Sequence, residues 1–281
     1  MPKTYATEEH VSLALAAFAY ISADGTIPVT PLRLKNLAPG WSLQGVANWS
    51  AYIDYADHGR SDRSSTFSGT SPVWTPILID FQGTVMGGTI HVEVTGKARD
   101  EKTGAIDNLK WVGSTAIRGT NPDASQVKSR LSDIPSQVVA YKESRFQQFG
   151  SDGLPKFGPP NGFGVMQIDS PGAPPTVDQI WRWKQNCDDG KAILAAARTT
   201  VAQHYRNLAT AHPQLPALTA DALNHAAYQY YNAGNKGFYW VPNADFTAWD
   251  KNSSAYTAYG DDACLIEAAV RAGNPPADWG S

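Results

Sequence analysis

The sequence predicts two domains of different fold class, an all-β sandwich over residues 1–120 and a mainly α domain over residues 121–281. Residues 24–118 contain short alternating or β-branched runs separated by clusters of Gly, Pro, Asp and Ser, which is typical of strands joined by turns. After Asn121 the apolar residues recur at helical spacing instead. A chain of 281 residues is long enough to build a hydrophobic core in each half.

The β half is best defined by the segment GTIHVEVTG, in which Ile90, Val92 and Val94 alternate with polar residues and so face one side of a strand. The runs SLQGVANWSAYIDYAD, PVWTPILIDFQG and LKWVGSTAIRGT have the same character. Strands at this spacing, with no helical segment between them, predict a small β-sandwich.

The α half contains several segments with a period near 3.6 residues. NPDASQVKSRL, IPSQVVAYKESRFQQF, DDGKAILAAARTTVAQHYRNLATAH and DDACLIEAAVRAG are each expected to form a helix. The second of these is predicted to run from Pro135 to Phe149. TADALNHAAYQYYNAG is a further helix, with Thr219 as the expected N-cap and Gly234 as the expected C-cap.

Charge and the N-terminal residues exclude several classes of partner. A net charge of −3 provides no general basic field that would hold nucleic acid. The apolar run Val11–Ile21 is too short to span a bilayer, and Glu8 and Glu9 stand where a signal peptide needs positive charge. We therefore expect no nucleic-acid binding, no membrane span and no conventional export signal. Cys187 and Cys264 lie in separate predicted helices and can form one disulfide or none.

Patterns typical of metal or cofactor sites are weak. The six histidines show no HExxH or similar spacing, and neither a phosphate-binding Gly-rich loop nor a G-x-S-x-G elbow occurs. The segment DYADHGRSD lacks a recognised ligand spacing, so we interpret it as a solvated loop rather than a metal site. Its four metal-capable residues are Asp54, Asp57, His58 and Asp62. We predict no metal and no cofactor.

One acidic residue falls within an apolar helical stripe. Val139, Glu143 and Phe146 occupy positions i, i+4 and i+7, so they share one face of the predicted helix. A carboxyl on a core-facing stripe loses hydration, which raises its pKa and can keep a general acid protonated near neutral pH. The alternatives are a Glu143 that pairs with Lys142 or Arg145, or one that simply lies at the edge of the stripe.

The loop after this helix contains the segment PPNGFGVMQID, which carries a second group of candidates. Gly162 and Gly164 flank Phe163 and allow the backbone to approach a ligand closely. Gln167 offers a donor and an acceptor to an amide, and Asp169 is a second carboxyl.

Four motifs occur in a characteristic order. KESRF is followed by NGFGVMQID, then by QNCDDGKAIL with Asn186, Gly190 and Leu194, and finally by AYQYYNAGNKG. Together they resemble the helix-borne ES segment, the NGFGLMQVD segment, the N-I-x-x-G-x-x-x-L helix start and the AYNAG segment of the lytic transglycosylase and goose-type lysozyme superfamily. Those enzymes cleave the β-1,4 bond between N-acetylmuramic acid and N-acetylglucosamine. The resemblance covers roughly residues 121–240.

The resemblance implies a role for each matched residue. Glu143 is the implied acid that protonates the leaving glycosidic oxygen, and Tyr231 would orient it. Phe163 is either a sugar contact or a plug in the local core, and one of Trp181 and Trp183 could extend the saccharide groove by stacking. The implied substrate-binding residues are Phe163, Gly164, Met166, Gln167, Tyr231 and Asn232.

The second carboxyl, Asp169, decides the reaction type. In goose-type lysozymes the matching Asp is proposed to position a water for inverting hydrolysis, which needs two carboxyls roughly 6.5–9.5 Å apart. Those lysozymes carry a further acid ahead of NGFG, where this chain has KFGPP and only a displaced Asp152. We therefore expect a lytic transglycosylase that gives 1,6-anhydro products. The alternatives are an inverting muramidase, a chitinase-like hydrolase, and a catalytically inactive glycan-binding or structural module.

These inferences combine into one expectation. An immunoglobulin- or fibronectin-like accessory domain would precede a lysozyme-like catalytic domain that cleaves peptidoglycan glycan strands in the periplasm or cell wall. Delivery would follow a non-classical route, through a secretion system or phage machinery, with an immunity protein as a candidate partner.

Overall fold

The computed structural model describes residues 5–6, 11–14, 18–27, 30–37, 39–72, 76–169, 174–234, 238–253 and 258–280. Parts of the expected PVWTPILIDFQG strand and the last three residues of AYQYYNAGNKG lie outside these ranges. The chain divides into two compact units that each draw on several segments. The first unit comprises Met1–Asn121, Phe149–Pro155 and Thr176–Arg182, and the second comprises Pro122–Gln148, Lys156–Pro175 and Trp183–Ser281.

The predicted fold class, an immunoglobulin- or fibronectin-like sandwich followed by a mainly α lysozyme-like domain, is wrong. The chain is mixed, with 34% helix and 31% strand. Its largest sheet is also mixed, because β1 (Tyr5–Ala6) and β3 (Phe18–Ile21) pair with β10 (Ile106–Gly119) in parallel, whereas β9 (Gly88–Asp100) pairs with β10 antiparallel. The alternation of apolar residues predicts strands but not the direction in which they pair, so the sequence pattern could not reveal this sheet.

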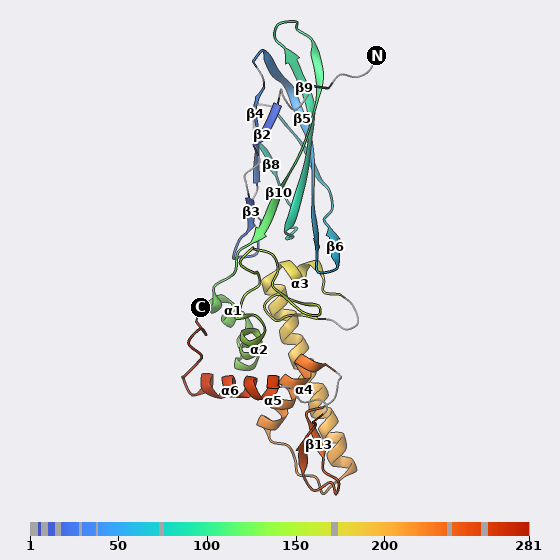
Figure 1. Cartoon of the computed structure of the whole chain (residues 1–281), viewed down its shortest axis with the longest axis vertical. Helices are drawn as coiled ribbons and strands as arrows, with labels where there is room; N and C mark the ends of the chain where they lie inside the picture. Colours follow the sequence, from blue (N-terminus) through green and yellow to red (C-terminus); the bar gives the residue numbers. More distant parts are fainter. Residues whose placement is uncertain are drawn as a thin grey trace. The chain divides into compact units, whose positions relative to one another are not determined.

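The first unit is built on three long strands that lie side by side (Figure 1). β5, β9 and β10 form antiparallel pairs, and their inward-facing residues include Ile53, Val92 and Val94, which are buried as the alternation predicts. A separate three-stranded sheet has the order β2-β4-β8. Besides β1, β3 and β10, the strands of this unit are β2 (Val11–Ala14), β4 (Thr30–Leu37), β5 (Trp41–Asp57), β6 (Arg60–Arg63), β7 (Phe67–Pro72), β8 (Ile77–Ile79) and β9 (Gly88–Asp100).

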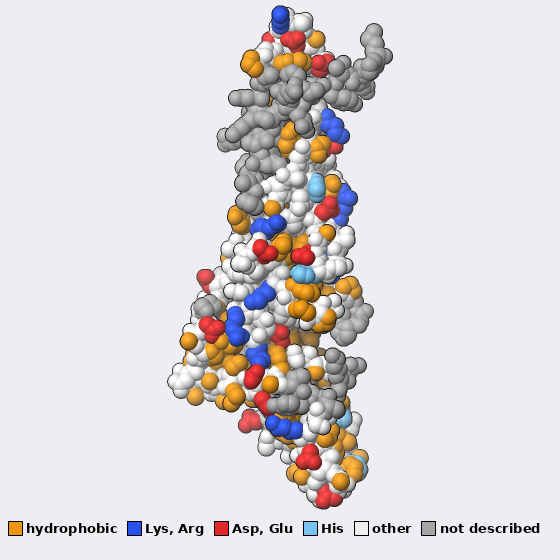
Figure 2. Space-filling model, in the orientation of Figure 1, with side chains coloured by type: hydrophobic (Ala, Val, Ile, Leu, Met, Phe, Trp, Pro, Cys, Tyr) orange, Lys and Arg blue, Asp and Glu red, His pale blue; other side chains and the backbone are white. Residues whose placement is uncertain are grey.

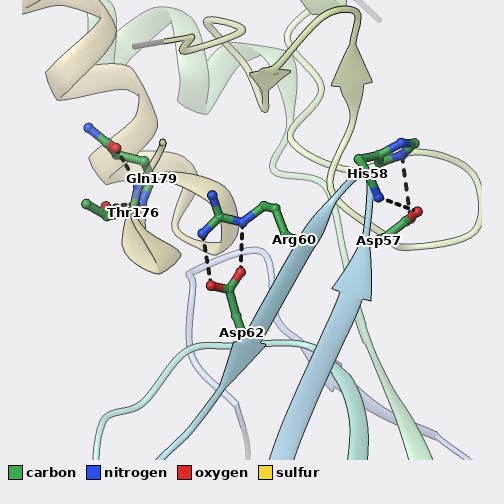
Figure 3. A network of polar contacts seen from close by, with 6 residues as sticks. All are labelled: Asp57, His58, Arg60, Asp62, Thr176 and Gln179. Atoms are coloured by element: carbon green, nitrogen blue, oxygen red, sulfur yellow. Dashed lines mark hydrogen bonds and ion pairs between the residues drawn. The ribbon is translucent and has the colours of Figure 1, made fainter. Parts of the chain in front are cut away.

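A short helix from the later part of the chain, α3 (Val177–Trp181), also belongs to the first unit. It begins at a capping box, in which the Gln179 backbone N–H donates to Thr176 Oγ1 at 3.2 Å and the Thr176 N–H donates to Gln179 Oε1 at 2.8 Å (Figure 3). These two bonds satisfy backbone donors that a helix start otherwise leaves unpaired. The cap therefore defines where this short helix begins.

Trp181 anchors α3 in the core of the first unit. Its indole is fully buried and lies 5.1 Å from the Tyr55 ring and 6.0 Å from the Phe149 ring. Gly87 faces the indole so closely that a Cβ there would lie 2.3 Å from it. Trp183, two residues later, is buried in the second unit. Both tryptophans therefore pack in a core, and neither offers an open face to a saccharide.

The acidic segment at the turn between β5 and β6 forms ion pairs. Arg60 donates to both oxygens of Asp62 at 2.8 and 2.9 Å, and His58 Nε2 lies 3.5 Å from the Asp57 carboxylate (Figure 3). Within the part of the chain that the structure describes, no three His, Cys, Asp or Glu side chains converge as metal ligands would.

In the residues that the structure describes, the second unit combines five helices with two small hairpins (Figure 1). Thr219 accepts a hydrogen bond from the Ala222 N–H at 3.1 Å and Gly234 follows the last helical turn, so both predicted caps of α5 are confirmed. Cys187 and Cys264 are free thiols. The elements are α1 (Ala124–Leu131), α2 (Ile134–Ser144), β11 (Phe157–Gly158), β12 (Gly162–Phe163), α4 (Trp183–Ala211), α5 (Ala220–Ala233), β13 (Trp240–Pro242), β14 (Trp249–Lys251) and α6 (Ala258–Arg271).

Helix α2 is shorter than predicted. The sequence pattern extends to Phe149, but the helix ends at Ser144 because Arg145 and Phe146 both adopt positive φ angles. Apolar spacing alone cannot reveal this stop, since Phe146 remains buried after the chain leaves the helix.

The described helices and the surface bear on the classes of partner. None of the helices in the described ranges is both long and apolar enough to cross a bilayer. On the face that Figure 2 shows, acidic and basic side chains are interspersed, as the small net charge of −3 leads one to expect.

Candidate active site

Glu143 lies on the last turn of α2 and is half-buried. Asp133 is the N-cap of this helix, and its side chain accepts from the Ser136 N–H at 2.9 Å, while Pro135 occupies the first turn. At the other end, the Tyr259 hydroxyl, from the first turn of α6, donates a 2.6 Å hydrogen bond to Glu143 Oε1. Two helices that are far apart in the sequence therefore meet at this carboxyl.

The electrostatic surroundings favour the protonated form of Glu143. Burial raises the pKa of its carboxyl above the ordinary value, and the Tyr259 hydrogen bond and the Lys142 charge only partly offset this effect. The ion pair expected as an alternative is not formed. Lys142 pairs with Asp262 at 3.0 Å and Arg145 pairs with Asp278 at 3.2 Å.

Two tyrosines border the Glu143 carboxyl. Tyr231, on α5, donates its hydroxyl proton to the Met166 carbonyl at 2.7 Å. Burial and then the charge of Glu143 raise the pKa of both Tyr231 and Tyr259 well above the usual value. Both phenols therefore stay neutral, and each can donate one hydrogen bond.

Ser144 links the end of α2 to the turn that contains the GFGVMQ motif. Its buried hydroxyl donates to the Val165 carbonyl at 2.8 Å and contacts the Ala140 carbonyl at 3.1 Å. The same oxygen accepts from the Gln147 N–H at 3.1 Å. The residue next to Glu143 is thus tied to both the helix and the turn.

Two buried amides hold the turn itself. Asn186, on α4, accepts from the Met166 N–H and donates to the Phe163 carbonyl, both at 2.8 Å. Gln148 Oε1 accepts from the Val165 N–H at 3.1 Å. Gly164 sits between the two amides with a φ of +77°, and a Cβ there would lie 2.6 Å from each of them. A residue larger than glycine would therefore displace this cage.

Several residues near the candidate acid have a left-handed backbone conformation. Arg145, Phe146 and Gln167 have φ angles of 59°, 62° and 46°, and they are three of the seven non-glycine residues with positive φ in the described chain. The left-handed conformation costs an L-residue roughly 1–2 kcal/mol. Such outliers persist where the surrounding structure over-determines them, and they tend to cluster at functional sites.

Three of the residues predicted to line the substrate pocket instead build the local core. Phe163 is 2% exposed and packs against the Phe157 ring at 5.2 Å, which agrees with the plug rather than the sugar contact. Met166 is fully buried. The Gln167 amide donates to the carbonyls of Lys156 and Gly164 at 3.1 and 2.8 Å, so it braces the β11–β12 hairpin.

The other two predicted residues are exposed. Asn232 lies on the last turn of α5, and Asp169 follows the turn that Asn186 holds. The structure therefore brings Glu143, Tyr231 and the Met166 carbonyl together, with Gly164 in the supporting turn.

Sequence reasoning missed the residues that support Glu143. Tyr259 stands 116 residues further on, at the start of a helix, and no local pattern links it to the acid. Gln148 is the second of two adjacent glutamines between Phe146 and Phe149, and nothing in the sequence distinguishes it from Gln147. Ser144 belongs to the ES pair of the KESRF motif. The motif does not show that the Ser144 hydroxyl donates to the Val165 carbonyl.

Comparison of the chain with models of known families, with curated proteins and with solved structures finds no match.

The Tyr259 hydrogen bond predicts a change in pH dependence. It stabilises the ionised carboxylate, so Tyr259→Phe is expected to raise the pKa of Glu143 further. If Glu143 acts as an acid, activity falls as pH rises through its pKa. Tyr259→Phe should therefore move this fall in activity to higher pH. If the protein cleaves glycan as the motif resemblance implies, the pH profile of that cleavage measures the shift. Tyr231→Phe is the control, since its hydroxyl bonds Met166; an equal shift in both variants would contradict the assignment.

Proposed function

We propose that this protein cleaves the glycan strands of peptidoglycan, with Glu143 as the general acid. The single observation that carries the proposal is the half-buried Glu143 carboxyl, whose pKa burial raises and whose Oε1 is held by Tyr259 at 2.6 Å. A carboxyl whose pKa is raised holds its proton to higher pH than an exposed glutamate, and it can transfer that proton to a leaving glycosidic oxygen. The order of the KESRF, NGFGVMQID, QNCDDGKAIL and AYQYYNAG motifs supports peptidoglycan as the substrate, by resemblance to lytic transglycosylases.

We propose that the cleavage is non-hydrolytic. The group that hydrogen-bonds Glu143 is a phenol rather than a second carboxylate, and Asp169 is exposed. Glu143 would protonate the leaving oxygen while the acetamido group of the substrate assists departure. The resulting carboxylate would accept the proton of the 6-hydroxyl of the muramic residue as that oxygen attacks C1. The acid is then restored, and the product is a 1,6-anhydro sugar formed without water.

Digestion of purified peptidoglycan tests this proposal. The released muropeptides are expected to be one water lighter than reducing-end products when read by mass spectrometry. Ordinary reducing ends would favour hydrolysis by an inverting muramidase instead. No release, under conditions in which a control enzyme releases fragments, would favour a glycan-binding or structural module.

Asp169→Asn separates the two reaction types. If no base is needed, replacing this exposed residue should change the release rate by no more than about threefold, because surface substitutions usually stay within about 0.5 kcal/mol. A catalytic base would instead contribute about 10²–10⁴-fold. Rates of muropeptide release from the two proteins measure the difference. Asp152→Asn, at another exposed acid, is the matched control.

A further inference from the structure

The segment 274–280, which we call the strap, folds back onto the end of α2. The Trp279 indole is 8% exposed and lies 5.2 Å from the Phe146 ring in an edge-to-face contact. It also packs against the Tyr141 ring at 5.1 Å. Lys128 donates to the Trp279 carbonyl at 2.9 Å, so the strap backbone is fixed as well as its side chain.

Asp278, the preceding residue, binds the same end of the helix through its carboxylate. It accepts a hydrogen bond from the Tyr141 hydroxyl and pairs with Arg145 Nε at 3.2 Å. The Arg145 guanidinium lies over the Tyr141 ring at 4.1 Å and donates to the Tyr141 carbonyl at 2.6 Å. The Tyr141 hydrogen bond is the main reason that the pKa of Asp278 lies below its usual value, so the carboxylate is ionised at neutral pH.

These contacts fall on the two strained residues that follow the candidate acid. Arg145 and Phe146 both have left-handed backbone angles, and the strap touches the side chain of each, Arg145 through Asp278 and Phe146 through Trp279. Consecutive left-handed residues without glycine need such external support. Glu143 and Ser144 come directly before them, so a change in this turn would move the helix end that carries both.

We propose that Asp278 and Trp279 are positioning residues for Glu143. By holding the Arg145–Phe146 turn, the strap keeps the last turn of α2 in the place where the Glu143 carboxyl meets Tyr259. The catalytic part of this inference rests on the proposed function, whereas the support of the turn does not. Asp278 contacts Tyr141 and Arg145, and Trp279 contacts Tyr141 and Phe146, so both residues act on Glu143 through the turn.

Four variants test the strap. Trp279→Ala removes the packing, Trp279→Phe retains an aromatic ring, and Asp278→Asn removes the charge. Trp249→Ala is the control, because Trp249 is another indole of the second unit, partly buried, and it packs against a different core cluster. For each protein we would measure kcat and KM on soluble uncrosslinked peptidoglycan strands, and amide hydrogen exchange over residues 143–149.

Trp279→Ala is expected to lower kcat about 10- to 100-fold with KM changed less than about threefold, since small displacements of a catalytic group cost rate more than binding. Trp279→Phe should recover most of the rate, and Asp278→Asn should lose less than Trp279→Ala. Exchange over 143–149 should accelerate in Trp279→Ala and not in Trp249→Ala.

An equal kcat loss in Trp279→Ala and Trp249→Ala, or unchanged exchange over 143–149 in Trp279→Ala, would overturn the role of the strap. If the wild-type protein cleaves no glycan, the proposed function fails. Amide hydrogen exchange over residues 143–149 then remains as the test of whether the strap holds the turn. Faster exchange in Trp279→Ala would then support its hold on the turn, and unchanged exchange would refute it.

Discussion

Glu143→Gln is expected to lower the rate of muropeptide release from peptidoglycan by about 10²- to 10⁴-fold, the usual contribution of a general acid. The amide has nearly the same shape as the carboxyl, and its oxygen can still accept the Tyr259 hydrogen bond. What the variant lacks is the transferable proton. The measurement is the initial rate of release at the pH where the wild-type protein is most active.

The same variant provides its own test of folding. Burial raises the pKa of Glu143, so its ionised form is the less stable one in the folded chain, and stability falls as pH rises through the folded pKa. Glu143→Gln should therefore unfold at the same or a higher temperature than the wild-type protein above neutral pH. Loss of activity together with a lower melting temperature would point to misfolding instead of a lost acid. An active variant would remove Glu143 from the mechanism.

Gly164→Ala is expected to have the largest effect on the stability of the second unit. The new Cβ would lie 2.6 Å from the amides of Asn186 and Gln148, both of which bond the turn. Overpacking costs about 1–3 kcal/mol, and a left-handed alanine adds about 1–2 kcal/mol. Because the turn supplies the Met166 carbonyl to Tyr231, glycan cleavage should fall as well.

Gly273→Ala is the matched control for this prediction. Gly273 also belongs to the second unit and has a φ of +78°, close to the +77° of Gly164, but nothing lies within 4 Å of the position that a Cβ would occupy there. Gly273→Ala should therefore lower the free energy of unfolding only by the cost of a left-handed alanine, without the cost of overpacking. Thermal unfolding of the two variants measures the difference, and equal losses would show that the amide cage is not rigid.

Local patterns predicted the parts of the fold that depend on neighbours in the sequence. The alternation at Ile90, Val92 and Val94 indicated a buried strand face, and Thr219 and Gly234 cap α5 as expected. The parallel pairing of β1 and β3 with β10 depends on contacts across roughly a hundred residues, which no local period encodes. The predicted fold class was wrong for this reason.

In the candidate site, too, the sequence predicted what depends on neighbouring residues and missed what depends on distant ones. The apolar stripe indicated that Glu143 faces inward, and the structure places it half-buried beside Tyr231 and Tyr259. The stripe could not show that α2 ends at Ser144, because the two left-handed residues that follow are Arg145 and Phe146 rather than glycines. The contacts that hold them come from residues 278 and 279, more than 130 positions away.

The most direct test of the central claim is the pKa of Glu143 itself. NMR can follow the ¹³C chemical shift of each glutamate side-chain carboxyl as a function of pH in protein labelled at that carbon. The Glu143 signal is assigned by its loss in Glu143→Gln. We expect Glu143 to titrate above the ordinary glutamate value of about 4.3, so that it holds its proton at higher pH than an exposed glutamate. A pKa at or below that value would refute the role of Glu143 as the acid, because the residue would then be an ordinary carboxylate with no proton to give.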